Sequence, residues 1–370
     1  MKILILSKRQ YTNLDLIDNR YGRIRELPLA LAKLGHEITG FCLSYRSRSE
    51  GIHTDVDNNA CVTWHSLDLK RLFSFGPGSY LGKLNSIFQG NKPDLIWATS
   101  DALHIILGAC VAKRYKTHFV ADLYDNYESF PVIRLTGGKK IFRYALKHAD
   151  GLTCVSRPLA RYIRETTAFD WPLEVIENAV RKDIFYPMDK FECRRELGLS
   201  DKGFYIGTAG AISKSRGIEV LIDAFQILAQ QNPDIHLVLA GSCDKDLALP
   251  QNSRIHYLGI LPPDRVPVFL SALDVQIICN KDSEFGRYCF PQKFYEAVAC
   301  RVPIVATDVG AMHETLNDNP GHLFKPGDVI DLVSVLQRQM KTPSPLPIDA
   351  VTWDNHGKKL ETFFQTILSR

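Results

Sequence analysis

The chain has 370 residues, of which 45% are hydrophobic and 23% are charged, and its formal net charge is +4 at pH 7. This length predicts two domains of ordinary size. No apolar run approaches the roughly 18 residues of a membrane-spanning helix, and Ile3–Leu6 is too short for the apolar region of a signal peptide. The nine cysteines form no C-x-x-C pair, so we interpret them as core residues in a reducing cytoplasm.

The charge is unevenly distributed along the chain. Met1–Val175 carries 24 Lys and Arg against 17 Asp and Glu, whereas the remainder carries 21 against 24. A basic first half favours an anionic partner, which can be a membrane surface, a nucleic acid or a phosphorylated ligand. Ordinary solubilising charge is the alternative.

Short apolar, β-branched segments alternate with helical patterns in the first half of the chain. Several are apolar on both faces, as is typical of parallel strands covered by helices. The predicted strands are Lys2–Ser7, Glu37–Leu43, Val62–Leu67, Asp94–Ser100, His118–Tyr124, Gly151–Ser156 and Glu174–Glu177. The spacing also predicts a helix over Ile24–Leu34 that ends at Gly35, although Pro28 disfavours its early turns.

The alternation of strand-like and helical segments starts again after a predicted linker at Asn178–Lys190. Apolar spacing predicts a helix from Ile218 to Leu228, and Lys341–Ile348, with three prolines, should be irregular before a final helix. The strands predicted here are Phe204–Gly210, Ile235–Ala240, Ile255–Leu258, Val275–Cys279 and Pro303–Thr307. The pattern predicts an α/β fold of two doubly wound domains that face each other across a cleft, with ligands beyond the carboxyl ends of the strands.

A glycine-containing segment, Gly207–Gly217, links the first strand of the second domain to the following helix. Gly210 permits close approach of the backbone to a phosphate, and Lys214 and Arg216 offer charge-assisted hydrogen bonds to a diphosphate. The alternative is an ordinary tight turn with two solvated cations.

A second segment, Phe290–Ala299, reads as the start of a helix with Pro291 in its first position. Lys293 and Glu296 would share one face, where the carboxylate could accept hydrogen bonds from a ribose diol. A surface ion pair is the alternative. The preceding Glu284–Tyr288 is predicted to be a loop whose amides contact a sugar or phosphate.

A third cluster follows the strand that ends near Tyr124. Asp122, Tyr124, Asp125 and Glu128 could contact sugar hydroxyls or move a proton. Capping of a helix by Asp125 or Asn126 is the alternative.

A basic segment with an apolar stripe follows this cluster. It is predicted to form a helix suited to an anionic membrane interface, the alternative being a surface helix packed on the sheet. Its basic residues are Arg134, Lys139, Lys140, Arg143 and Lys147, interleaved with Ile141, Phe142, Tyr144 and Leu146.

Six short motifs occur in an order that resembles glycosyltransferase family 4, the retaining nucleotide-sugar enzymes of GT-B fold. They are Gly35–Thr39, Val175–Val180 followed by Phe185 and Pro187, Leu239–Ser242, Tyr257–Gly259, Pro291–Ala297, and Pro303–Gly310 followed by Glu314. The resemblance covers nearly the whole chain. It implies an acceptor-binding domain at 1–180, a nucleotide-sugar-binding domain at 181–345, and a helix at 346–370 that returns to the first domain.

The resemblance also implies a function. It predicts a hexosyltransferase that moves a sugar from a UDP- or GDP-sugar to a lipid-linked or surface-polysaccharide acceptor, with retention of configuration. The implied donor-binding residues are Gly210, Lys214, Arg216, Tyr288, Lys293, Glu296 and Gly310. The implied acceptor-binding residues are Arg20, Arg23 and Arg25, and the candidates for catalysis are Asp122, Tyr124, Asp125 and Glu128.

Three positions depart from the family pattern. Ala211 stands where an arginine is usual, Tyr288 where a glutamate is usual, and Tyr124 where a histidine is usual. The departure at Tyr124 leaves the catalytic residue open among the four candidates.

No metal or other cofactor is expected. The family is usually treated as metal-independent, and the D-x-D sequence at Asp55–Asp57 is predicted to lie in a loop far from the donor site in sequence. We expect a cytoplasmic protein that binds the inner face of the membrane peripherally and has no nucleic-acid partner. The alternatives are a sugar-nucleotide epimerase and a non-catalytic subunit that binds a nucleotide sugar, the latter suggested by Ala211 and Tyr288.

Overall fold

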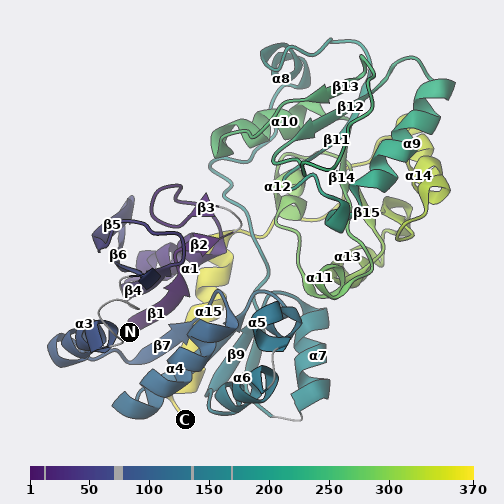
Figure 1. Cartoon of the computed structure of the whole chain (residues 1–370). Coiled ribbons are helices and arrows are strands. Elements are labelled where there is room, and N and C mark those ends of the chain that lie inside the picture. The colour runs from purple at the N-terminus through teal and green to yellow at the C-terminus, as the bar shows by residue number, and fades with distance from the viewer. Residues whose placement is uncertain (12–13, 71–77, 135–136, 168–169) are drawn as a thin grey trace. The chain divides into compact units, whose positions relative to one another are not determined.

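The computed structural model describes residues 1–11, 14–70, 78–134, 137–167 and 170–370. The chain forms two compact α/β units (Figure 1). Unit 1 contains Met1–Glu177 together with Trp353–Arg370, and unit 2 contains Asn178–Thr352.

Unit 1 is built on an eight-stranded sheet with the order β10-β9-β8-β7-β1-β4-β6-β5. All neighbouring strands pair in parallel except β5, which is antiparallel to β6. The bounds are β1 Lys2–Lys8, β4 Glu37–Ser44, β5 Gly51–Asp57, β6 Ala60–Asp68, β7 Leu95–Ala98, β8 His118–Leu123, β9 Gly151–Cys154 and β10 Leu173–Val175. The seven strands predicted for this region are confirmed.

Helices and a small hairpin surround this sheet. The helices are α1 Arg23–Lys33, α3 Gly78–Gly90, α4 Ala102–Tyr115, η1 Tyr127–Ser129, α5 Pro131–Arg134, α6 Gly138–Lys147, α7 Arg157–Thr167 and α15 Trp353–Leu368. The hairpin consists of β2 Gln10–Tyr11 and β3 Leu14–Asp15.

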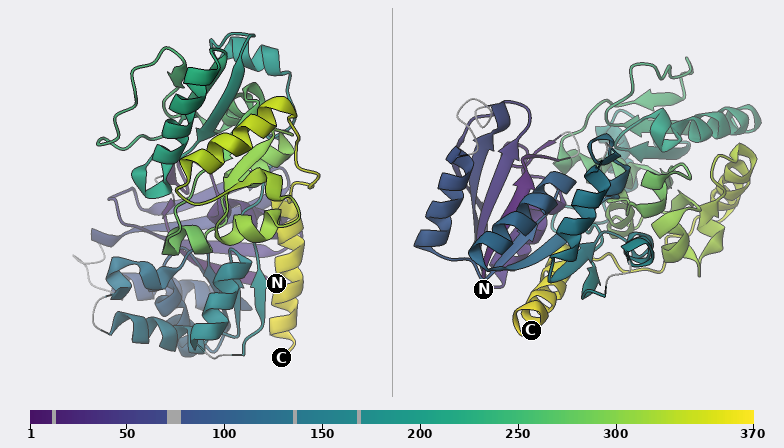
Figure 2. Two further views of the ribbon diagram at one scale, coloured as in Figure 1. Left: turned by 90° about the vertical axis from the view of Figure 1, so that its right-hand side faces the viewer. Right: turned by 60° about the horizontal axis from the view of Figure 1, so that its bottom comes forward.

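The last helix, α15, packs against α1 within unit 1 (Figure 2). A Cβ on Gly357 would lie 2.7 Å from the Cβ of Ala30, so the two helices meet closely at a position where only glycine fits. The ring of Phe364 meets that of Trp97 edge-on at 5.8 Å, which ties α15 to β7 as well.

Unit 2 is built on a six-stranded parallel sheet with the order β13-β12-β11-β14-β15-β16. Its strands are β11 Phe204–Ala209, β12 Ile235–Ala240, β13 Ile255–Tyr257, β14 Val275–Ile278, β15 Ile304–Thr307 and β16 Leu323–Phe324. Its helices are α8 Lys190–Glu196, η2 Lys214–Arg216, α9 Ile218–Gln231, η3 Pro263–Arg265, α10 Val266–Ala272, α11 Glu284–Tyr288, α12 Lys293–Ala299, α13 Gly310–Leu316, η4 Pro320–His322 and α14 Val329–Lys341.

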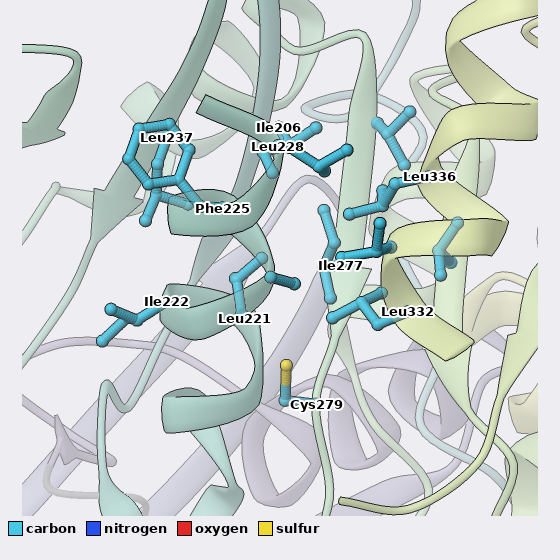
Figure 3. Packing of buried hydrophobic residues seen from close by; sticks show 14 of the residues in the cluster. Ile206, Leu221, Ile222, Phe225, Leu228, Leu237, Ile277, Cys279, Leu332 and Leu336 are labelled. Carbon is cyan, nitrogen blue, oxygen red and sulfur yellow. The ribbon is translucent and has the colours of Figure 1, made fainter. Parts of the chain in front are cut away.

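The core of unit 2 lies between the sheet and the helices α9 and α14 (Figure 3). Leu221 and Phe225 of α9 are fully buried, as their three-to-four-residue spacing predicts. Leu332 and Leu336 of α14 join the same cluster. Each such side chain stabilises the fold by about 1.5–3 kcal/mol, and together they hold β11 and β14, whose ends carry the site described below.

Three local predictions are wrong. Glu284–Tyr288 is a short helix because Ser283 accepts a hydrogen bond from the Gly286 amide at 3.2 Å and caps it. Helix α12 begins at Lys293, so Pro291 lies before the helix instead of in its first position. Asp55–Asp57 lies in strand β5 instead of a loop, because this segment pairs with β6, and an ion pair with Arg25 of α1 offsets the burial of Asp55.

Candidate functional site

The residues predicted to bind a donor follow neighbouring strands of unit 2. Gly210 comes directly after β11, and the turn η2 with Lys214 and Arg216 then leads into α9. Helix α12, with Lys293 and Glu296, lies between β14 and β15, and Gly310 opens α13 after β15. Because the carboxyl ends of parallel strands meet at one edge of a sheet, these turns gather where doubly wound domains bind ligands.

Two glycines at this edge adopt backbone conformations that L-residues rarely take. The φ angles are +118° at Gly210 and +57° at Gly310. A Cβ on Gly310 would clash with the carbonyl oxygens of Gly286 and Arg287, since the first would be only 2.6 Å away. The backbone at the start of α13 therefore contacts the backbone at the end of α11 directly, and position 310 has no room for a side chain.

The ammonium group of Lys293 lies beside the end of β11 and the turn that follows it. It donates a hydrogen bond to the Thr208 hydroxyl at 3.1 Å, and it lies 3.5 Å from the position that a Cβ on Gly210 would take. Burial lowers the pKa of Lys293 to about 8; the nearby thiol of Cys279 opposes this shift and the Arg216 guanidinium adds to it. A cation in this position would be stabilised by an anionic ligand.

Arg216 and Lys214 differ in how firmly they are held. The Arg216 guanidinium stacks on the ring of Phe285, with 3.6 Å between its central carbon and the ring centroid. Lys214 is exposed, and its ammonium lies 3.9 Å from Asp246. Arg216 is therefore the better preorganised cation of the pair.

Glu296 is buried on α12 with an exposed fraction of 7%. One of its carboxylate oxygens accepts a hydrogen bond from the Gln292 side chain at 3.1 Å. Tyr288, the other predicted donor residue nearby, is partly buried and ends α11. The carboxylate of Glu296 is thus held by its own helix rather than lying on an open surface.

We expect binding of a nucleoside diphosphate to take up protons between pH 8 and 9. With a pKa of about 8, Lys293 is mostly neutral at pH 9, and an anionic ligand favours the protonated form. Affinity should fall as the pH rises through this range, by up to about tenfold per unit for one linked proton. Calorimetric titration in buffers of different ionisation enthalpy measures the uptake. Lys293→Met should abolish it, whereas uptake that persists in this variant would exclude Lys293 as the linked group.

In unit 1, Asp122 and Arg23 form a buried ion pair. Both side chains are 1% exposed, and the guanidinium donates to the carboxylate at 2.6 and 3.2 Å. Thr99 and Thr153 donate to the same carboxylate at 2.7 and 2.6 Å, and Arg23 also donates to the Ile176 carbonyl. These contacts join α1 to β8 and β9, and the predicted roles of Asp122 in catalysis and Arg23 in acceptor binding stay predictions.

The other two arginines predicted to bind an acceptor lie in different environments. Arg25 is buried and donates to Asp55 at 2.7 and 3.0 Å and to Glu26 at 2.8 Å. Arg20 is exposed and lines a pocket of about 300 Å³ together with Ile17, Ile52, His53 and Trp64, among others.

The remaining candidates for catalysis lie after β8. Glu128 is buried and pairs with Arg143 at 2.6 Å and Lys139 at 2.8 Å. Burial raises the pKa of Glu128, but these hydrogen bonds outweigh burial, and the net pKa is lowered. Tyr124 and Asp125 are partly buried at the carboxyl end of β8, and the Lys8 ammonium lies 5.7 Å from the Tyr124 ring centroid.

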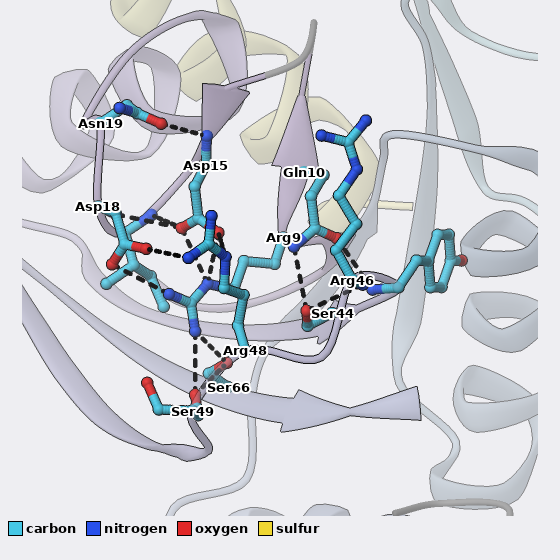
Figure 4. A network of polar contacts seen from close by, with 12 residues as sticks. Arg9, Gln10, Asp15, Asp18, Asn19, Ser44, Arg46, Arg48, Ser49 and Ser66 are labelled. Atoms are coloured by element: carbon cyan, nitrogen blue, oxygen red, sulfur yellow. Dashed lines mark hydrogen bonds and ion pairs between the residues drawn. The ribbon is translucent and has the colours of Figure 1, made fainter. Parts of the chain in front are cut away.

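A buried arginine fixes the segment between β1 and α1 (Figure 4). Arg9 is 1% exposed; its guanidinium donates to Asp15 at 2.8 and 2.9 Å and to Asp18 at 3.1 Å. It also donates to the Ser49 carbonyl at 2.9 Å and the Ser66 hydroxyl at 3.1 Å. This network anchors the β2–β3 hairpin to the loop after β4 and to β6.

The sequence analysis did not identify Asp101 and His104, a polar pair at the carboxyl edge of the unit 1 sheet. They follow β7, and the imidazole Nδ1 lies 2.8 Å from the Asp101 carboxylate. The signal was available, because residues just after a predicted strand were the ones to inspect, but the three-residue spacing on α4 resembles an ordinary helix start.

Two family models match the chain. "Glycosyltransferase Family 4" matches residues 23–183, and "Glycosyl transferases group 1" matches residues 203–341. The chain belongs to these glycosyltransferase families. One similar protein, with 26% identity, is the 2-deoxystreptamine glucosyltransferase of Streptomyces kanamyceticus, aligned over 55% of this chain and 54% of the relative. Another is the lipopolysaccharide core mannosyltransferase LpsB of Rhizobium meliloti, with 27% identity over 49% of this chain and 51% of the relative. The alignments span about half the length of these curated relatives.

Solved structures of similar fold align with the whole length of this chain. Anabaena HepE in complex with UDP-glucose has a TM-score of 0.68 and 18% identity, and 98% of its chain is covered. The catalytic domain of Arabidopsis thaliana starch synthase IV has a TM-score of 0.73 and 13% identity, and 99% of its chain is covered. These similarities confirm the GT-B fold.

Within the described ranges, no helix is long and apolar enough to span a membrane. Among the same residues, no group of three or more His, Cys, Asp and Glu side chains is arranged to hold a metal ion.

Proposed function

We propose that the protein transfers a hexose from a nucleoside-diphosphate sugar to a hydroxyl-bearing acceptor, with retention of anomeric configuration. The observation that supports this most directly is the position of Lys293 beside Gly210 at the carboxyl edge of the unit 2 sheet, where its ammonium interacts electrostatically with Arg216 and Glu296. Two cations suit a diphosphate, and a carboxylate suits the ribose diol. Family membership agrees with this reading.

The donor we propose is a UDP- or GDP-sugar. HepE has been solved with UDP-glucose, and the relatives named above are a glucosyltransferase and a mannosyltransferase. The proposed acceptor is a saccharide, free or linked to a lipid, bound by unit 1. Transfer would proceed by front-face displacement, in which charge grows on the leaving diphosphate and the cations of unit 2 stabilise it.

A donor panel tests this function. UDP-glucose, UDP-N-acetylglucosamine, GDP-mannose and ADP-glucose are incubated with the protein and with mixed saccharide acceptors, and released nucleoside diphosphate and product are measured. One donor should release diphosphate, with the sugar appearing on an acceptor. Conversion of the donor sugar without an acceptor would identify an epimerase, and tight binding without any turnover would identify a binding subunit.

We expect turnover to be unaffected by chelation. Arg216, and Lys293 at neutral pH, supply positive charge where other enzymes use a divalent ion. Activity with EDTA should therefore equal activity with magnesium or manganese. Loss of turnover in EDTA that either ion restores would contradict this mechanism.

We also propose that the protein works in the cytoplasm and binds an anionic membrane through helix α6. Ile141 and Tyr144 are 55% and 60% exposed on this helix, next to the exposed Lys140 and Lys147. Phe142 and Leu146 are buried, so the helix has one face on the unit and an amphipathic outer face.

Sedimentation with vesicles tests the membrane interaction. Each basic residue near an anionic surface contributes about 1 kcal/mol, so Lys140→Glu with Lys147→Glu should abolish most binding to phosphatidylglycerol vesicles. The matched control is Lys113→Glu with Lys116→Glu, also exposed in unit 1. Binding that does not change with salt concentration or with the anionic lipid content would refute the proposal, because electrostatic attraction is screened by salt.

A further inference from the structure

The Asp101–His104 pair stands at the topological switch point of the unit 1 sheet. Strand β1 has β4 on one side and β7 on the other, and the chain crosses from one half of the sheet to the other between β6 and β7. Open α/β sheets bind ligands beyond the carboxyl ends of the strands at this point. Asp101 follows β7, and Lys8 ends β1.

The pair has a defined hydrogen-bond geometry. Asp101 caps α4, and one of its oxygens accepts from the His104 amide at 2.9 Å and from the His104 ring nitrogen Nδ1 at 2.8 Å. Its other oxygen accepts from the Tyr45 hydroxyl at 3.0 Å. Because a carboxylate only accepts, Nδ1 carries the proton and Nε2 of a neutral His104 is left as an acceptor.

This acceptor nitrogen is buried without a hydrogen-bond partner. His104 is 2% exposed, and no described donor reaches Nε2. A buried polar atom without a hydrogen bond is unfavourable, and an incoming donor would supply the missing bond. The Tyr45 ring lies 6.2 Å from the His104 ring, so partly buried Tyr45, which follows β4, adjoins this position.

The backbone beside the pair is strained. Ser100, fully buried between β7 and Asp101, has φ of +84°, which a serine rarely adopts. Its hydroxyl accepts a hydrogen bond from the Lys8 amide at 2.7 Å and fixes the end of β1 to the end of β7. Such strain is concentrated at functional sites.

We propose that His104, oriented by Asp101, is a positioning residue whose Nε2 accepts a hydrogen bond from a hydroxyl of the saccharide acceptor. This rests on the proposed function and moves the acceptor subsite from Arg23 and Arg25, which are engaged in buried ion pairs, to the ends of β1, β4 and β7. A neutral hydroxyl fits because it donates to the one unpaired nitrogen without bringing charge into a buried position.

Two substitutions separate the two nitrogens of the ring. His104→Asn retains a donor near the Nδ1 position for Asp101 but has no acceptor at the Nε2 position. His104→Gln places its carbonyl oxygen near the Nε2 position. The matched control is His118→Asn, because His118 also lies beside an aspartate, Asp150 at 3.5 Å, but at the opposite end of β8.

The full-length protein labelled at histidine is titrated by NMR with p-nitrophenyl glucoside, mannoside, galactoside and N-acetylglucosaminide. At least one glycoside should shift the His104 ring resonances. Its affinity should fall by about threefold to tenfold in His104→Asn, the range of one hydrogen bond, and remain within about twofold of wild type in His104→Gln and His118→Asn. With the active donor, the acceptor KM should rise in His104→Asn and stay close to that of the wild type in His104→Gln and His118→Asn. The kcat and the hydrolysis of the donor without an acceptor should change little.

No shift of His104 with any glycoside would overturn the proposal, as would equal losses in all three variants. Binding of UDP and GDP is measured in parallel. Glycoside binding at His104 without any nucleotide binding would refute the proposed transferase and leave the hydroxyl subsite standing. Turnover of the nucleotide-sugar donor with no effect of His104→Asn on the acceptor KM would refute the hydroxyl subsite and leave the proposed transferase standing.

Discussion

Asp122→Ala is expected to lower the free energy of unfolding of unit 1 by about 3–5 kcal/mol. Removing the carboxylate leaves the Arg23 guanidinium buried without its counter-charge, and the Thr99 and Thr153 hydroxyls lose their acceptor. Tryptophan fluorescence during urea denaturation reports on this unit, because all four tryptophans, Trp64, Trp97, Trp171 and Trp353, belong to it.

Lys83→Ala is the matched control within the same unit. Its ammonium is 3.9 Å from Glu50 and is 48% exposed, so the loss should stay below about 1 kcal/mol. A similarly small loss for Asp122→Ala would contradict the structural role of the pair.

A double substitution separates structure from chemistry at Asp122. Apolar residues of similar size often replace a buried ion pair at little cost, so Arg23→Met with Asp122→Leu should recover much of the lost stability. If this double variant is stable and turns over the donor, Asp122 is not catalytic. If it is folded but inactive, the predicted catalytic role gains direct support.

The sequence predicted the parallel strands well because their signal is local. Continuous apolar runs such as Leu237–Ala240 can be recognised without knowledge of the neighbouring strands, and the spacing from Ile218 to Leu228 determines one buried helix face. Strand β5 was missed because its alternate residues Ile52 and Val56 are 67% and 55% exposed and its charged Asp55 is buried. The pattern there opposes the usual arrangement of apolar residues inside and polar residues outside.

The site was predictable only where its residues lie close in sequence. Lys293 and Glu296 share one short segment, whereas the contact of Lys293 with Thr208 spans 85 residues and depends on the order of β11 and β14 in the sheet. Arg23 and Asp122 are 99 residues apart, and nothing local marks them as partners. Polar residues at strand ends could therefore be nominated from sequence, but which of them pair with each other depends on topology.

Arg216→Ala and Glu296→Gln should weaken binding of the nucleoside diphosphate in different ways. Arg216 is held against Phe285 and offers bidentate donors to a diphosphate, so its loss should cost about 1.5–3 kcal/mol for the diphosphate and little for the free nucleoside. Glu296→Gln retains size but exchanges an acceptor for a donor, so it should weaken the nucleoside and the diphosphate alike. Turnover should also fall in Arg216→Ala, because charge on the leaving diphosphate grows in the transition state.

Calorimetric titration with nucleoside, monophosphate and diphosphate separates these two roles. The matched control is Lys214→Ala, whose exposed ammonium should contribute less than Arg216. In Arg216→Ala the loss should grow with each added phosphate, whereas in Glu296→Gln it should be present already with the nucleoside. Equal losses for nucleoside and diphosphate in Arg216→Ala would mean that the residue acts through packing on Phe285, and the diphosphate would then have to be assigned to Lys293 and the glycine turns alone.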